Sequence, residues 1–192
     1  MHSPTSENLK VFSIRSKTFK RSLLLHPDKL PDFIKGIEKI TNNEVFVLNG
    51  NIGMEIYYLS PYGIDDAIKV LFGTYASTTL NLSSVVFQNK NSKDASLNHF
   101  SATVVMLSKH PQLFLATSKK FIHMVKKSKK DDLIPLLLFD VYKKTIVQIG
   151  KNLTPYLNKI NQLKDFGLDK PSDSEQVIKS LIAKALESQK RN

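Results

Sequence analysis

The stretch "EVFVLNGNIGMEIYYL", residues 44–59, carries the clearest structural signal in the chain. Two runs rich in β-branched and aromatic residues flank the pair Asn49-Gly50, which favours the positive φ angles of a tight hairpin turn. We therefore predict a β-hairpin over this stretch, with its turn at Asn49-Gly50. Together with the strands and helices predicted on either side, this hairpin indicates an α+β fold built on an antiparallel, hairpin-rich sheet.

Further strands are predicted on both sides of the hairpin. The stretch "LKVFSIRS", residues 9–16, alternates apolar and polar side chains as a half-buried strand does. Residues 79–88 and 97–107 are also rich in strand-forming side chains, and the polar segment between them is typical of a hairpin loop. The sheet would then have about five strands, with helices at residues 17–25, 31–41 and 63–76 packed on one face.

The C-terminal third is predicted to be helical. Apolar residues recur at helical spacing over residues 112–130, 131–150 and 153–167. A short linker at 169–173 then precedes a last helix that opens with Ser172 and Glu175 at capping-box spacing. We expect a single α+β domain over residues 1–168, β-rich to about residue 110 and helical after it, followed by an amphipathic C-terminal helix over 173–190.

The charge balance suggests an anionic partner. The chain has 28 Lys and Arg against 17 Asp and Glu, a formal net charge of +11. This favours attraction to nucleic acid, to an anionic membrane surface or to an acidic protein segment. Arginine, the residue best suited to bidentate phosphate and base contacts, is present only at Arg15, Arg21 and Arg191. Diffuse electrostatic attraction is therefore a better interpretation than sequence-specific DNA reading.

The basic residues are concentrated in one predicted helix. Seven lysines and no acidic residue occur from Lys109 through Lys130. On a helix, five of them would share a broad face opposite Phe121, Ile122 and Val125: Lys119, Lys120, Lys126, Lys127 and Lys130.

This face has two interpretations, a docking surface for an anionic partner and an ordinary solvated helix face. Phe121, the one aromatic residue among these lysines, is expected to point to the core rather than to stack on bases. An acidic protein partner is therefore favoured, with nucleic acid as the alternative.

One short motif resembles a known family. His26-Pro27-Asp28-Lys29 is similar to the loop by which J-domain co-chaperones stimulate their chaperone ATPase, and basic residues precede it as in that family. The resemblance covers at most residues 16–41, and the family's preceding helix has no counterpart here. We favour a helix stop imposed by the proline, with His26 or Asp28 capping the neighbouring segment. The resemblance implies a co-chaperone acting through His26, Pro27 and Asp28 as a further alternative.

No residue pattern indicates catalysis, a metal or a cofactor. The chain has no cysteine, and His99, His110 and His123 match no metal-site spacing. The acidic pairs Asp65-Asp66 and Asp131-Asp132 each precede a helical pattern, where their charge complements the helix N-terminus. We therefore expect a protein that is not an enzyme.

These features together predict a non-catalytic adaptor or scaffold subunit that binds an acidic protein segment. The composition, rich in Lys, Asn and Ile without Cys, would suit a subunit of a bacterial secretion or trafficking complex. No apolar run reaches the roughly 18 residues of a membrane span, and the N-terminus lacks an apolar signal region. We accordingly expect a cytoplasmic protein without a transmembrane segment.

Overall fold

The computed structural model describes residues 6–17, 24–50, 53–76, 82–129 and 131–150. The strands are β1 (Leu9–Ser16), β2 (Val45–Gly50), β3 (Gly53–Leu59) and β4 (Val85–Lys90). The helices are α1 (Leu30–Thr41), α2 (Asp65–Tyr75), α3 (Lys93–Ser108), α4 (Pro111–Lys127) and α5 (Leu133–Gly150). The helices predicted at 153–167 and 173–190, and most of the one at 17–25, lie outside the described residues.

The four strands form one antiparallel sheet in the order β2-β3-β1-β4. The predicted hairpin is confirmed as β2 and β3, and the predicted strand at 9–16 is β1. The turn was predicted at Asn49-Gly50. Gly50 is instead paired with Gly53, so Asn49 and Gly50 lie within β2. The first strand of the chain, β1, lies inside the sheet between β3 and β4.

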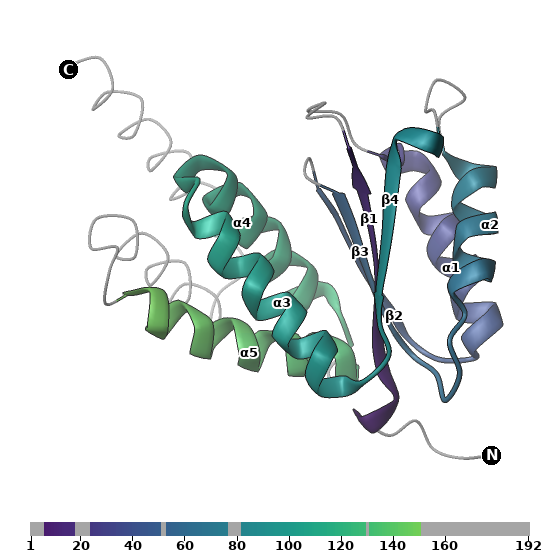
Figure 1. Cartoon of the computed structure of the whole chain (residues 1–192). Coiled ribbons are helices and arrows are strands. Elements are labelled where there is room, and N and C mark those ends of the chain that lie inside the picture. The colour runs from purple at the N-terminus through teal and green to yellow at the C-terminus, as the bar shows by residue number, and fades with distance from the viewer. Residues whose placement is uncertain (1–5, 18–23, 51–52, 77–81, 130, 151–192) are drawn as a thin grey trace.

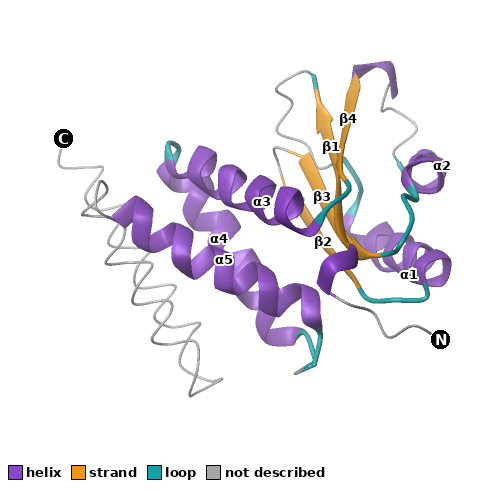
Figure 2. Cartoon of the chain, turned by 60° about the horizontal axis from the view of Figure 1, so that its bottom comes forward, coloured by secondary structure: helices purple, strands orange, loops and turns teal. Residues whose placement is uncertain are grey.

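Helices cover both faces of the sheet, which corrects the expectation of one covered face. Figures 1 and 2 show α1 and α2 on one side and α3, α4 and α5 on the other. The apolar side chains of β1 alternate between the two layers: Val11 packs with α3 to α5, and Phe12 packs with α1 and α2. β3 in particular is apolar at nearly every position, because both of its faces are buried.

Each layer has its own apolar core. Aromatic rings anchor the core on the α3–α5 side, where Phe121 contacts Phe46, Phe100 and Tyr142 at centroid distances of 6.1, 5.2 and 5.1 Å. The core on the α1–α2 side is built from aliphatic and aromatic side chains that are almost fully buried, among them Phe12, Ile14, Phe33, Ile37, Ile56, Tyr58 and Phe72.

The fifth strand predicted at 97–107 is wrong, because these residues belong to α3. The Oγ of Ser92 accepts a hydrogen bond from the N–H of Ala95 and so caps the helix. The buried residues Phe100, Val104 and Leu107 follow at helical spacing. Packing on the sheet thus outweighs the strand preference of the Thr and Val residues in this stretch.

The remaining helix predictions agree with the structure. α1, α2, α4 and α5 occupy the predicted stretches, with Asp65 and Asp66 in the first turn of α2. α5 is only partly buried, since Leu136 and Val147 are 49% and 63% exposed. In the part of the chain that the structure describes, no helix combines the length and apolar character of a membrane span.

Candidate functional site

The structure places the predicted lysines on the solvent side of α4. Lys120, Lys126 and Lys127 are exposed and Lys119 is half-buried, whereas Lys130 lies outside the described residues. Phe114, Ser118, Phe121 and Ile122 form the opposite, buried side of the helix. We call Lys119, Lys120, Lys126 and Lys127 the lysine face.

One member of the lysine face contacts the sheet. The Nζ of Lys120 donates a hydrogen bond to the main-chain carbonyl of Asn49 in β2. Burial lowers the pKa values of Lys119 and Lys120, because a charged ammonium loses part of its hydration near the protein. The lysine face therefore reaches from solvent to the edge of the sheet.

The main-chain groups of β2 alternate between the sheet and this outer edge. The N–H of Ser60 donates to the carbonyl of Asn8 at 3.1 Å, so the even-numbered residues of β3 bond to β1. The odd-numbered residues of β3 consequently bond to the even-numbered residues of β2. Val45, Val47 and Asn49 direct their N–H and C=O groups outward, where no other described strand pairs with them.

A cavity of about 280 Å³ lies beside this edge. Its lining is largely apolar and comes from four elements: Ile34 of α1, Val45 of β2, Met124 of α4, and Ile134 and Pro135 of α5. Lys127 of the lysine face also lines it. We call this space the edge cavity.

The two carboxylates that line the edge cavity, those of Glu44 and Asp132, accept hydrogen bonds from main-chain N–H groups. Glu44 accepts hydrogen bonds from the N–H groups of Leu133, at 2.9 Å, and Ile134, which are orphan donors at the start of α5. Asp132 accepts from the N–H of Lys129 at 2.8 Å. Burial raises the pKa of the Glu44 carboxyl, and the two hydrogen bonds from α5 oppose that rise without cancelling it.

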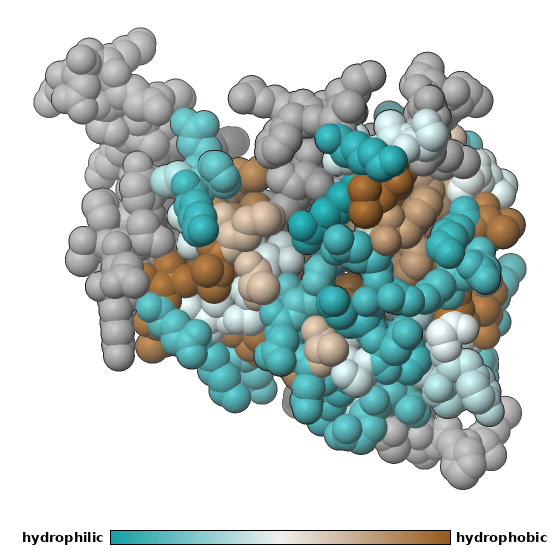
Figure 3. All heavy atoms as spheres, viewed as in Figure 1, coloured by the Kyte–Doolittle hydropathy of each residue, from teal (hydrophilic) through white to brown (hydrophobic). Residues whose placement is uncertain are grey.

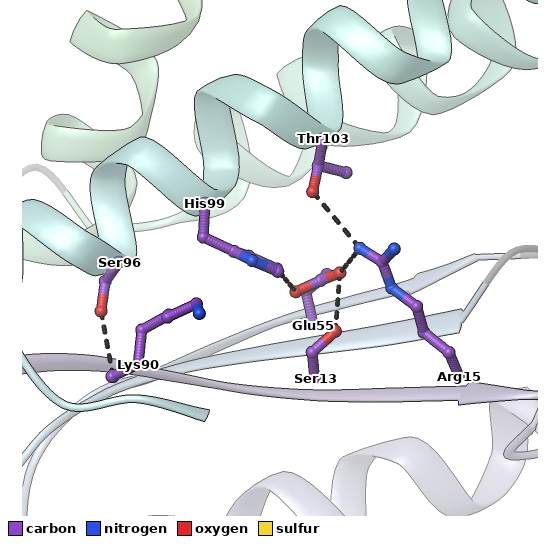
Figure 4. A network of polar contacts seen from close by, with 7 residues as sticks. All are labelled: Ser13, Arg15, Glu55, Lys90, Ser96, His99 and Thr103. Atoms are coloured by element: carbon purple, nitrogen blue, oxygen red, sulfur yellow. Dashed lines mark hydrogen bonds and ion pairs between the residues drawn. The ribbon is translucent and has the colours of Figure 1, made fainter. Parts of the chain in front are cut away.

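A second polar centre lies between the sheet and α3 (Figure 4). The Glu55 carboxylate accepts from Ser13 Oγ at 3.0 Å and from Arg15 Nη2 at 2.9 Å, and its other oxygen lies 2.7 Å from His99 Nε2. Arg15 Nη2 also lies 3.5 Å from Thr103 Oγ1. The Glu55 side chain is only 9% exposed and both of its oxygens are bonded. This network joins β1, β3 and α3.

Two opposing effects set the charge of Glu55. Burial acts to raise the pKa of its carboxyl, but the hydrogen bonds and charges of His99 and Arg15 outweigh burial and lower it. The carboxylate is thus held ionised by its partners. Because both oxygens are occupied, we assign the network to holding α3 on the sheet rather than to chemistry.

A smaller cavity of about 140 Å³ adjoins this network. Glu55, Thr103, Thr117 and Lys120 contribute its polar groups, among apolar side chains such as Leu113. Lys120 therefore lies against this cavity while its ammonium bonds to the edge of β2.

The His-Pro-Asp motif forms an exposed turn immediately before α1. His26 Nδ1 lies 3.4 Å from the N–H of Asp28, which it caps, and 3.2 Å from the Asp28 carboxylate. The two side chains are 71% and 85% exposed. The helix predicted before this turn falls mainly on residues outside those described, so the co-chaperone alternative stays a prediction.

The described histidines and acidic residues form no metal site. Among the described residues, no three His, Asp or Glu side chains gather in a way that could hold a metal ion. Figure 3 shows apolar residues at the surface where α3, α4 and α5 lie, and a hydrophilic zone separates them from those near α1 and α2.

Glu44, Met124 and the Glu55–His99 pair were not predicted from the sequence. A signal for Glu55 exists, since it is the one charged residue in the apolar strand "GMEIYYL". Its partner His99 is 44 positions away, and no spacing rule connects them. Glu44 and Met124 gain their positions only from tertiary packing.

Comparison with protein families, with curated proteins and with solved structures finds no match to this chain. The function is therefore inferred from the geometry of the lysine face and the edge of β2.

Proposed function

We propose that the protein is a non-catalytic adaptor or scaffold subunit that binds an acidic segment of a partner protein through the lysine face. The observation that carries the proposal is the clustering of four lysines on one side of α4, none of them paired with an acidic side chain of the described residues. Unpaired like charges repel one another, and an acidic partner would relieve that repulsion.

The surroundings of the lysine face support a protein partner over nucleic acid. Phe114 and Phe121, the two phenylalanines of α4, are 3% and 2% exposed and cannot stack on bases. Arg15 forms an ion pair with Glu55 and belongs to β1, not to α4. The lysine face thus offers point charges without the guanidinium groups or the exposed Phe, Tyr or Trp rings that nucleic-acid sites use.

The proposal is tested by titrating the full-length protein into two fluorescent probes of equal net charge. One probe is a glutamate-rich peptide and the other is a single-stranded oligonucleotide, and binding is followed by fluorescence anisotropy. We expect the peptide to bind more tightly than the oligonucleotide at about 0.15 M salt, where exposed charges are already partly screened. A charge-neutral peptide of the same length, with glutamine for glutamate, serves as the control.

Two results would contradict the proposal. Absence of peptide binding even at low salt would exclude an acidic-segment site. Preferential oligonucleotide binding, with log affinity falling linearly against log salt concentration, would instead assign the lysine face to phosphate backbones.

A further inference from the structure

We infer that the edge cavity selects the partner segment: it takes one apolar side chain of an acidic segment whose carboxylates pair with Lys120 and Lys127. This inference rests on the proposed function and adds to it a sequence requirement. The segment would lie along the outer edge of β2, between α1 and α4.

The lining of the edge cavity is suited to an apolar anchor. Ile34, Val45, Met124 and Ile134 are all partly or fully buried hydrophobic residues, and they come from four elements of the folded domain. A volume of about 280 Å³ lies just below the range of sites for small molecules, roughly 300–1,000 Å³. One side chain of a peptide is therefore a better occupant than a cofactor-sized ligand.

The charges around the edge cavity favour acidic neighbours for that anchor. Glu44 and Asp132 also line the cavity and keep their negative charge, which hydrogen bonds from main-chain N–H groups offset in part. Glu44 in particular bonds to the positive N-terminal end of α5. Lys127 lines the cavity and has no acidic partner among the described residues.

The spacing of the lysines predicts the spacing of the carboxylates. Seven residues of helix separate Lys120 from Lys127, a rise of about 10 Å. An extended peptide covers that length in about three residues. A peptide with two acidic residues about three positions apart therefore matches the spacing of Lys120 and Lys127. Its apolar anchor would lie next to the acidic residue that pairs with Lys127. The outward N–H and C=O of Val45 offer that segment main-chain hydrogen bonds.

The test uses a panel of synthetic eight-residue peptides and the full-length protein. Every peptide carries two glutamates three positions apart, and the position next to one of them is varied among leucine, methionine, phenylalanine, serine and lysine. We expect the three apolar variants to bind at least tenfold more tightly than the serine variant.

Two matched protein variants locate the anchor. Met124→Lys places a cation in the edge cavity, and Met106→Lys adds the same charge on α3, where Met106 is 38% exposed. We expect Met124→Lys to lose the preference for apolar anchors and Met106→Lys to keep it. Attraction by charge alone would instead strengthen the binding of every peptide to both variants.

A second readout needs no substitution. The chain contains four methionines, so ¹³C-methyl-methionine labelling gives a simple NMR spectrum. We expect the leucine peptide to shift the Met124 signal, to leave those of Met54 and Met106 in place, and the serine peptide to shift none of them.

The outcomes separate the two proposals. Binding of all peptides with equal affinity, or an unmoved Met124 signal, would overturn the edge cavity as an anchor site and leave the acidic-segment function standing. An apolar preference that survives in Met124→Lys would also overturn it. Absence of binding by every peptide would overturn both proposals.

Discussion

The ammonium of Lys120 on α4 donates a hydrogen bond to the main-chain carbonyl of Asn49 at the outer edge of β2. Edge strands carry unpaired main-chain groups, and a lysine beside them discourages unspecific strand pairing. Lys120 also lines the smaller cavity, so one side chain joins the lysine face, the sheet edge and a cavity. For this reason we propose that the partner binds beside β2.

Gly53, at the start of β3, is expected to tolerate no side chain. Its φ is +147°, and an added Cβ would lie 2.6 Å from the carbonyl oxygen of Ile14 in β1. Gly53→Ala should therefore lower the free energy of unfolding by roughly 1–3 kcal/mol. Urea unfolding followed by circular dichroism measures the change. Gly63→Ala, whose Cβ would meet no atom within 4 Å, is the matched control with an expected change below about 0.5 kcal/mol.

Glu55→Gln is expected to destabilise the fold by on the order of 3 kcal/mol near neutral pH, because Arg15 and His99 lose a charged partner in a buried site. The exposed Glu38→Gln on α1 should change little. Equal losses in the two variants would contradict the assignment of the Glu55 network to fold stability.

The same variant has a defined pH dependence. Since the pKa of Glu55 is lowered from its ordinary 4.5 in the folded state, its contribution is present above about pH 4.5 and is lost as the pH falls through the folded value. The difference in unfolding free energy between wild type and Glu55→Gln should therefore shrink in acid. A difference that grows below pH 4.5 would show that the carboxyl is protonated in the fold.

Glu44→Ala is expected to lower the unfolding free energy by about 1 kcal/mol, since α5 loses the acceptor for two N–H groups in its first turn. Glu44→Gln should recover part of the loss, because an amide oxygen still accepts. The pKa of Glu44 is raised, so wild type should gain stability over Glu44→Ala as the pH falls toward 4.5, opposite in sign to Glu55. Denaturant titrations of the three proteins at several pH values measure these differences.

Local patterns predicted most of the elements from the sequence. β1, the β2–β3 hairpin and the helices α1, α2, α4 and α5 follow from periodicity, turn residues and helix-start signals. α3 was mistaken for a strand, because its Thr and Val residues favour strands and its cap at Ser92 lies in a stretch that resembles a loop. The helical spacing of Phe100, Val104 and Leu107 was the competing signal.

The contacts between helices and strands were harder to predict from the sequence. The continuous apolar runs of β2 and β3 are the pattern of strands buried on both faces, and they could have indicated helices on each side of the sheet. The lysines of α4 were found because four of them share one helix face. The edge cavity was not, because Ile34, Val45, Met124 and Ile134 come together only through packing of four elements.

The role of the lysine face in binding is tested by comparing two triple variants that carry equal net charge. The first removes Lys119, Lys126 and Lys127, each changed to alanine; the second removes the exposed Lys29, Lys35 and Lys144 on other elements. Binding of the glutamate-rich peptide to each full-length variant is measured by fluorescence anisotropy at about 0.15 M salt, where every exposed ion pair contributes at most about 1 kcal/mol. We predict at least a tenfold loss of affinity for the first variant and less than a twofold loss for the second. Equal losses for both variants would contradict this role, because binding would then depend on total charge and not on the lysine face.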